Sequence, residues 1–369
     1  MRKVYLLSLL LFFLTVQVKN TFAQSSNLSE ETPKLNLSGF MDVFYAYDFN
    51  KPKTNYRQTF FYNHNRHQEL NLNLGYIKAS LEHTKYRANF ALQAGTYTND
   101  NYISVPGVLK NVFEANIGLS LNKKNNLWLD AGILSSIIGF ETAVSSENWT
   151  LTRSILAENS PYYLTGAKLS YKPNQQWELV AMLCNGWQRI QKQTGNSLPA
   201  ISTQIKYTPT EKTTLNWSTF VGTDEPDSTR KMRYFNNFFG QYQLNQKLGI
   251  ILGFDIGIQQ RTINSTKYDV WYSPVMLVRY AFNDRWATAC RAEYYNDETG
   301  IIIPTNTPNG FKTTGLSLNL DYSANKNLLC RIEGRWLNSE DDIFVEDQTI
   351  KNTDFFIVTS IALKFNQLP

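Results

Sequence analysis

The sequence predicts an all-β chain that folds as a transmembrane, antiparallel, up-and-down β-barrel of about 16 strands. Three observations support this class. Apolar and polar residues alternate with period 2 over segments of around ten residues, which is long for the strands of a soluble sandwich. Short polar turns alternate with much longer loops along the chain. Aromatic residues stand beside the short turns, where the head groups of a lipid bilayer would lie.

The N-terminal stretch, residues 1–23, has the pattern of a secretory signal peptide. Arg2 and Lys3 form its positive start, Val4 to Val18 are mostly apolar, and Ala23 is a small residue at the expected cleavage point. The alternative is an uncleaved anchor helix. It is less favoured because the apolar run is shorter than the ~20 residues that cross a bilayer.

The rest of the chain divides into a short N-terminal periplasmic segment, residues 24–34, and the barrel, residues 35–369. Its three cysteines lie far apart without Cys-x-x-Cys or Cys/His spacing, so we expect neither a zinc site nor a redox centre. The net charge is +5, and it falls to +2 (33 basic against 31 acidic residues) without the three basic residues of the leader. This balance argues against nucleic acid as a partner.

The strands are recognised by their alternation. Residues 316–322 are one example, because Leu316, Leu318 and Leu320 share one face while small and polar side chains occupy the other. Residues 248–258 repeat the pattern with isoleucine, leucine and phenylalanine. After the leader, no segment reaches 18 consecutive apolar residues, so we expect strands rather than helices to cross the membrane.

The connections set the strand number. Seven short polar turns are expected at residues 84–85, 122–126, 172–176, 208–212, 245–247, 282–285 and 323–327. Eight longer loops are expected at residues 51–65, 97–111, 133–163, 186–199, 223–232, 259–268, 296–310 and 337–353. Fifteen connections join sixteen strands, and both chain ends then lie on the short-turn side, as in outer-membrane barrels. Closure satisfies every backbone hydrogen-bonding group in lipid.

Aromatic residues flank several of these turns, as Tyr171 and Trp177 do around residues 172–176. Such side chains favour the head-group region, although strands in general are also rich in them. The rival architecture is a secreted propeller or sandwich, because the hairpin repeat of about 40 residues is close to a blade length. The unequal loops and the lack of a repeated blade motif favour the membrane barrel.

Several motifs resemble one known family. They are SGFMDVFYAYDF at 38–49, FYNHNRH at 61–67, ENWTLTRS at 147–154, AENSPYY at 157–163 and GWQ at 186–188. Together they resemble the OmpL-like family of β-barrel porins, over the first half of the chain. The resemblance implies an outer-membrane location and a pore, with outer-membrane lipid and the barrel assembly machinery as partners. It implies no particular solute.

The longest loop, residues 133–163, is the candidate constriction. It carries four charged residues that would lie in the path of a solute if the loop folded into the lumen: Glu141, Glu147, Arg153 and Glu158. The alternative is an extracellular loop packed on its neighbours, and the sequence leaves both open.

Strand parity places a further set of charges toward the lumen, because Arg or Lys on the lipid face would cost ~2–4 kcal/mol at mid-membrane. The pore-lining candidates from the strands are Asp42, Arg87, Glu114, Asp130, Arg291, Glu293, Arg331, Glu333 and Arg335. Lys168, Asp321 and Lys364 have the same parity. The signs are mixed on both walls, so no ion selectivity is predicted.

No catalytic or metal centre is expected. His64 and His67 stand three apart in a loop that enters a strand, where such positions point to opposite faces, and a hydrogen-bonded loop pair is favoured over a metal site. No Gly-x-Ser-x-Gly motif occurs. We therefore expect no enzyme and no cofactor.

The sequence is best interpreted as a channel in the outer membrane of a Gram-negative bacterium that passes small hydrophilic solutes by diffusion. Two alternatives are an outer-membrane barrel enzyme of the lipase type and a plugged barrel with a structural or adhesive role. By analogy with sixteen-stranded porins, a homotrimer is expected.

Overall fold

The computed structural model describes residues 32–347 and 349–367, and sixteen antiparallel strands in this part of the chain close into one barrel. This confirms the predicted fold class and strand number. The predicted signal peptide, residues 1–23, lies outside the described residues, as does nearly all of the expected periplasmic segment, residues 24–34. The first strand begins at Lys34, one residue before the expected start of the barrel.

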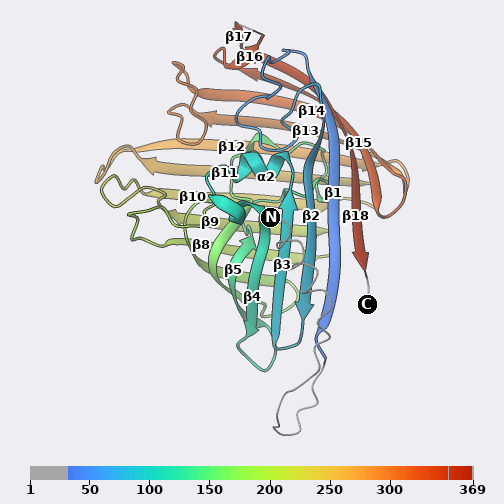
Figure 1. The fold of residues 1–369 in the computed structure, drawn as a ribbon, viewed down its shortest axis with the longest axis vertical. Helices are drawn as coiled ribbons and strands as arrows, with labels where there is room; N and C mark the ends of the chain where they lie inside the picture. The colour runs from blue at the N-terminus through green and yellow to red at the C-terminus, as the bar shows by residue number, and fades with distance from the viewer. Residues whose placement is uncertain (1–31, 348, 368–369) are drawn as a thin grey trace, which may run out of the picture. The chain divides into compact units, whose positions relative to one another are not determined.

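Each strand of the barrel pairs with its neighbours in sequence, and the last strand closes the ring on the first. The strands are β1 (Lys34–Asp48), β2 (Leu70–Glu82), β3 (Tyr86–Ala94), β4 (Val112–Ser120), β5 (Leu127–Ser135), β6 (Tyr163–Tyr171), β7 (Trp177–Cys184), β8 (Ala200–Thr210), β9 (Thr213–Gly222), β10 (Arg233–Gln243), β11 (Leu248–Gln260), β12 (Tyr268–Ala281), β13 (Trp286–Asp297), β14 (Phe311–Ser323), β15 (Leu328–Ser339) and β18 (Thr353–Gln367). Figure 1 shows β18, in red, running beside β1, in blue. At this closure Met41 lies opposite Leu363.

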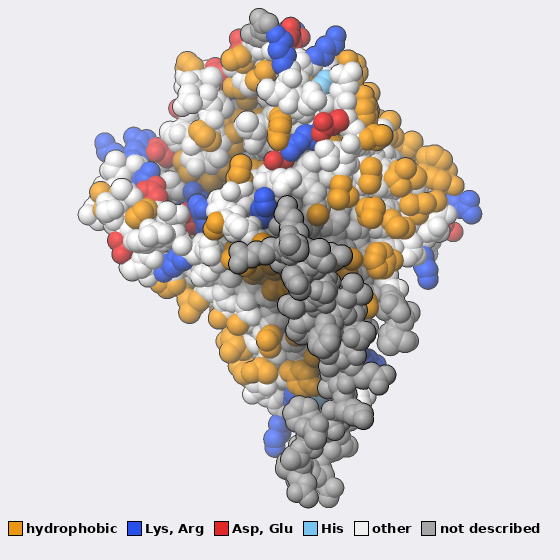
Figure 2. All heavy atoms as spheres, in the orientation of Figure 1, with side chains coloured by type: hydrophobic (Ala, Val, Ile, Leu, Met, Phe, Trp, Pro, Cys, Tyr) orange, Lys and Arg blue, Asp and Glu red, His pale blue; other side chains and the backbone are white. Residues whose placement is uncertain are grey.

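The polarity of the barrel wall is reversed relative to a soluble protein, because its outer face is apolar and its inner face is polar. In β14 the side chains of Leu316, Leu318 and Leu320 are exposed, while those of Ser317, Asn319 and Asp321 are buried. Figure 2 shows hydrophobic side chains gathered over part of the outer face. An apolar outside and a polar inside suit a wall that faces lipid.

Aromatic side chains stand at the short-turn end of the wall, as the sequence predicts. Trp177 stacks on Tyr207 with ring centroids 4.2 Å apart, and Trp286 packs against Tyr322 at 4.7 Å. Both tryptophans are exposed on the outer surface. Their amphipathic rings suit the head-group region of a bilayer.

The long loops contain short elements that the period-2 pattern does not predict. These are α2 (Thr96–Asn101), η1 (Gly107–Asn111), η2 (Ser145–Glu147), α3 (Ile155–Glu158) and a separate hairpin of β16 (Phe344–Glu346) and β17 (Thr349–Lys351). None of the helices described is long and apolar enough to cross a membrane. β5 continues to Ser135, so the longest loop covers residues 136–162 rather than 133–163.

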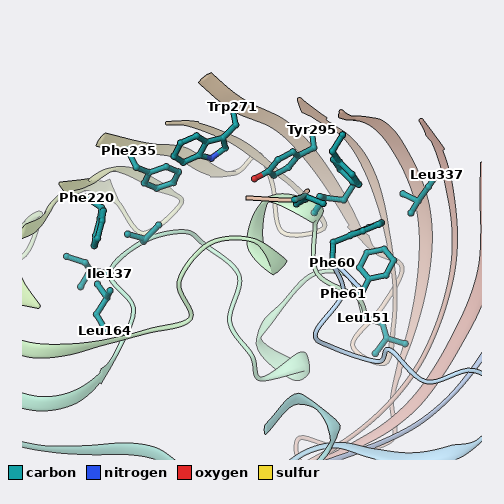
Figure 3. Close-up of a cluster of buried hydrophobic side chains, with 14 of the residues drawn as sticks. Phe60, Phe61, Ile137, Leu151, Leu164, Phe220, Phe235, Trp271, Tyr295 and Leu337 are labelled. Atoms are coloured by element: carbon teal, nitrogen blue, oxygen red, sulfur yellow. The ribbon is translucent and has the colours of Figure 1, made fainter. Parts of the chain in front are cut away.

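A hydrophobic cluster fills part of the barrel interior. Figure 3 shows Phe235, Trp271 and Tyr295 on the inner side of the wall, with Phe60 and Phe61 of the loop between β1 and β2 inside the barrel. Phe60 lies 4.8 Å from Phe311, measured between ring centroids. The core of this protein is therefore inside the barrel, and it is made by wall residues together with inserted loops.

Candidate functional site

The barrel interior is the candidate site, and its first feature is a chain of buried charges on β13 and β15. Arg291 contacts Glu293 at 3.1 Å and Glu333 at 2.8 Å, and Arg335 contacts Glu293 at 2.5 Å. All four side chains are fully buried. Buried charges are tolerated only when they are paired and hydrogen-bonded, and here each finds a partner of opposite sign.

These charges also bind the backbone of the loop 136–162. Glu333 accepts hydrogen bonds from the Thr152 N–H at 2.6 Å and from its hydroxyl at 2.9 Å. Glu293 accepts the N–H of Ile155 at 2.7 Å, and Arg335 donates to the carbonyl oxygen of Arg153 at 2.9 Å. The loop therefore reaches across the lumen to the wall opposite its own strands, β5 and β6.

The tip of the loop is held by Arg331. This side chain pairs with Asp321 at 2.7 Å and donates to the carbonyl oxygens of four tip residues: Ser145, Asn148, Trp149 and Thr150. Asp321 stands two residues before the end of β14 at Ser323. The tip of the loop therefore lies deep in the barrel, toward the short-turn end.

An apolar patch on the inner wall packs against the same loop. Ile251 of β11, together with Val275 and Leu277 of β12, forms a buried cluster with Leu156 and Ala157 of α3. Phe140 of the loop packs against this cluster. It approaches β11 closely because Gly253 has no side chain, since a Cβ there would lie 2.6 Å from the Phe140 ring.

Polar residues within the loop stabilise its own fold. Arg153 is fully buried and donates to the carbonyl oxygens of Thr142 at 2.8 Å, Leu151 at 2.7 Å and Ala143 at 2.5 Å. Glu141 accepts hydrogen bonds from the backbone and side chain of Ser154. Burial raises the pKa of the Glu141 carboxyl.

A second inserted loop, residues 49–69, joins the first. Glu158 of α3 accepts the N–H of Tyr62 at 3.0 Å and the side-chain amide of Asn63 at 3.2 Å. Nearby, the Nε2 of His64 lies 2.9 Å from the carboxylate of Asp42 on β1, and both side chains are fully buried. The two loops thus form one packed body inside the barrel.

Glu158 gives this body a pH dependence. Burial raises the pKa of Glu158 from 4.5 to about 7, although Arg153 and the Tyr62 N–H act in the opposite direction. The folded state then binds the proton more tightly than the unfolded state does. The contribution of Glu158 to the free energy of unfolding therefore falls as the pH rises from 4.5 to about 7, by about 3 kcal/mol at most.

We expect wild-type protein to resist urea better at about pH 5 than at about pH 8, as followed by its heat-modifiable migration on a gel. Glu158→Gln is neutral at both pH values and should reduce the difference between the two urea midpoints. An unchanged difference in the Glu158→Gln variant would show that other groups cause the pH dependence.

The other half of the interior is open only at its short-turn end, because Tyr97 and Tyr102 of the loop after β3 pack against Ile133 and Tyr163 at its long-loop end. A polar cavity of about 500 Å³ lies along the inner faces of β2–β7, toward the short-turn end. Lys78 pairs with Glu114 at 2.6 Å across β3, and Arg87 pairs with Asp130 at 2.6 Å across β4. The side chain of Arg87 is 36% exposed, against 0% for Arg291, so Arg87 faces open space while its partner Asp130 is buried beside it. Lys168 lies 3.9 Å from Asp130.

Gly118 makes room for the Arg87–Asp130 pair. It lies between them in register on β4, and a Cβ there would overlap the Asp130 carboxylate and lie 3.0 Å from the Arg87 side chain. We expect Gly118→Ala to separate the pair and to destabilise the barrel by about 1–3 kcal/mol, measured as a lower urea midpoint. Gly334→Ala is the matched control, because the nearest atoms to its Cβ would be 3.9 Å away. Equal midpoints for the two variants would contradict this account.

The structure separates the predicted site residues into two groups. Arg87, Glu114 and Asp130 line the open cavity. The others, apart from Glu147, are buried beneath or within the inserted loops: Asp42, Glu141, Arg153, Glu158, Arg291, Glu293, Arg331, Glu333 and Arg335. The loops cover these nine side chains, so they do not face the open cavity, and their role as pore-lining or constriction residues stays a prediction. Glu147 is half-exposed and contacts Lys364 at 3.0 Å.

Sequence reasoning missed several residues of the interior. Trp128 lines the open cavity, and the Arg87 guanidinium lies 4.3 Å from the centroid of its ring. Lys78 pairs with Glu114, which also lines the cavity. Arg57 is buried beside Asp48 at 3.4 Å in the second inserted loop. The parity of their strands could have indicated Lys78 and Trp128, whereas no periodic signal marks a loop residue such as Arg57.

A closed antiparallel barrel of sixteen strands, apolar outside and polar inside with a loop folded into the lumen, defines the porin class of outer-membrane barrels. The chain belongs to the family described as "Putative beta-barrel porin-2, OmpL-like", whose sequence model matches residues 34–365. This confirms the resemblance found in the sequence. No curated protein matches the sequence.

Solved structures agree on the fold. The anion-selective porin from Comamonas acidovorans has a TM-score of 0.59 at 10% identity, over 90% of this chain and 100% of that one. The trimer form of OmpT from Vibrio cholerae has a TM-score of 0.60 at 9% identity, over 91% and 100%. The outer membrane channel DcaP of Acinetobacter baumannii has a TM-score of 0.58 at 11% identity, over 93% and 100%. At these identities the likeness concerns the fold alone.

Proposed function

We propose that this protein is a channel through which small hydrophilic solutes diffuse passively across the outer membrane of a Gram-negative bacterium. The observation that carries the proposal is the open polar cavity along β2–β7, beside a lumen otherwise filled by loops. Solutes would follow this wall, and the loop 136–162 would narrow the path from the opposite side.

The charges along this wall suit a channel without strong binding. Arg87, Lys168 and Lys172 line the cavity together with Glu114, Asp130 and Glu178, so positive and negative side chains face the same cavity in near balance. A path lined in this way offers hydrogen bonds to a hydrated solute without binding cations or anions strongly. Diffusion through it requires no cofactor.

Three further expectations belong to this proposal. Residues 1–23 would be removed as a signal peptide on export, and residues 24–34 would lie in the periplasm. Outer-membrane lipid and the barrel assembly machinery would be the partners during insertion. The chain would form a homotrimer, as the trimer form of OmpT does.

The lipase alternative gains no support from the histidines. His64 pairs with Asp42, but both are fully buried, and Nδ1 of His64 has no hydrogen-bond partner among the described residues. His67 accepts the N–H of Asp48 at 3.0 Å through its Nδ1. Neither histidine is placed to activate a serine toward a substrate.

The proposal is tested by single-channel conductance of the purified mature protein in planar lipid bilayers. We expect discrete, reproducible openings with ohmic current. Heat-modifiable migration on a gel serves as the control for a folded barrel. A folded barrel that carries no current would contradict the channel and favour the plugged structural or adhesive alternative.

A further inference from the structure

A second polar cavity lies among the long loops, at the opposite end of the barrel from the cavity along β2–β7. Its volume is about 250 Å³, and its walls come from the loops around Tyr62, Trp187, Asp224 and Ile301. This size suits a ligand smaller than the drug-like molecules that fill pockets of about 300–1,000 Å³.

Two guanidinium groups in this cavity have donors without a close acceptor. The Nε of Arg189 and the Nη1 of Arg233 each lie 4.0 Å from a carboxylate oxygen of Asp224, beyond hydrogen-bond distance. The other nitrogens of Arg233 donate to Oε1 of Gln259 at 2.9 and 2.7 Å. Among the described residues no closer partner holds the Arg189 guanidinium.

Two of the three acidic residues that line the cavity, Glu158 and Asp100, already have hydrogen-bond donors, and Asp224 accepts the N–H of Trp187 through one oxygen. Glu158 accepts hydrogen bonds from Tyr62 and Asn63. Asp100 accepts the side-chain amide of Asn65 at 2.8 Å and contacts Arg66 at 3.0 Å. Oδ2 of Asp224 is then the one carboxylate oxygen of this residue without a hydrogen bond among the described residues, and the free N–H groups of Arg189 and Arg233 outnumber it, which favours an anionic ligand group over a cation.

The loop that carries Arg189 is held in place before any ligand arrives. Asp224 accepts the N–H of Trp187 at 2.9 Å, and Gln188 bridges from the Tyr162 N–H at 2.7 Å to the Asn101 side chain at 3.0 Å. Arginine loses less entropy on binding when its surroundings are already ordered.

The same cavity has an apolar wall. Ile301 and Ile302 line it, and their N–H groups donate to the buried carboxylate of Asp297 at 2.8 and 2.7 Å. Trp187 packs edge-on against Phe220 at 5.0 Å and Phe235 at 4.9 Å between ring centroids. These contacts fix an apolar surface beside the two guanidinium groups.

We propose that this cavity binds small organic carboxylates. The carboxylate lies between Arg189 and Arg233, which recognise it through their planar donor forks, and the apolar body of the ligand lies against Ile301, Ile302 and Trp187. The inference rests on the proposed function in one respect: these carboxylates are solutes that the channel collects at its long-loop end.

The test is a titration of the folded, full-length mature barrel in detergent with benzoate, followed by saturation-transfer NMR. Benzamide, the uncharged counterpart of benzoate, is titrated in parallel. We expect benzoate to bind more tightly than benzamide, and Arg189→Gln to raise the apparent Kd for benzoate about tenfold. Arg230→Gln is the matched control, since this half-buried arginine pairs with Asp227 and does not line the cavity.

Two outcomes would overturn the inference: equal binding of benzoate and benzamide, or a Kd for benzoate that Arg189→Gln leaves unchanged. Current measurements separate this inference from the channel function. A conducting barrel that shows no preference for benzoate contradicts only the carboxylate site. A silent barrel that still binds benzoate through Arg189 contradicts only the channel.

Discussion

Glu333→Ala is expected to raise the single-channel conductance of the reconstituted barrel by at least about twofold. Glu333 accepts the Thr152 N–H and hydroxyl and pairs with Arg291, so its carboxylate joins the loop 136–162 to the wall at the centre of the lumen. Without it the loop loses this attachment. The half of the lumen that the loop fills then becomes available to ions.

The energetic reason is the charge that the substitution leaves behind. Arg291 is fully buried and would keep only Glu293 as an anionic partner, while the Thr152 N–H would lose its acceptor. Removing one member of a buried ion pair costs about 3–5 kcal/mol. The sixteen strands keep their own backbone hydrogen bonds, so we expect the loop to detach before the barrel unfolds.

The matched control is Glu298→Ala. Glu298 also pairs with a cation, Lys312, at 3.1 Å, but its side chain is exposed outside the lumen and its pairing is worth little. Both variants should keep heat-modifiable migration. A Glu333→Ala barrel that is folded and conducts like the wild type would contradict the narrowing role of the loop.

The wall of this barrel was predictable because lipid imposes a regular rule on every strand. In β14 the leucines at 316, 318 and 320 face outward, and the residues between them face inward, as their alternation predicts. The same rule assigned Arg87 and Arg291 correctly to the inner face. It could not say that Arg87 would be open to water and Arg291 covered, because that difference depends on the loop.

The packing of the loops follows no periodic pattern, so their contacts could not be predicted from the sequence. Arg331 holds four carbonyl groups of residues about 180 positions earlier in the chain, and no local pattern near either segment indicates this contact. The cavity with Arg189 and Arg233 is likewise assembled from several loops far apart in sequence. The motifs around residues 147–163 indicated the family but not the partners of each side chain.

The division of the lumen into an open and a filled half predicts where a thiol reagent can reach. In a background with Cys184→Ala, Cys290→Ala and Cys330→Ala, we expect Asn89→Cys to react with a cationic methanethiosulfonate. Asn89 lines the open cavity on β3 and is part-exposed. The attached group would stand in the proposed path, and the conductance should fall by about half.

Ser273→Cys is the comparison that makes this result decisive. Ser273 lies on the inner face of β12, two residues beyond Trp271, and it is fully buried with its hydroxyl donating to the Tyr294 carbonyl at 2.7 Å. It should neither react nor change the current. Reaction at both positions would mean that the loops do not fill the β8–β15 half. Reaction at Asn89→Cys without loss of current would place the path elsewhere. Conduction along β2–β7 is supported only if the reagent reacts with Asn89→Cys and lowers its current, while Ser273→Cys shows neither effect. Both positions face inward by strand parity, so only the inserted loops make them differ in access.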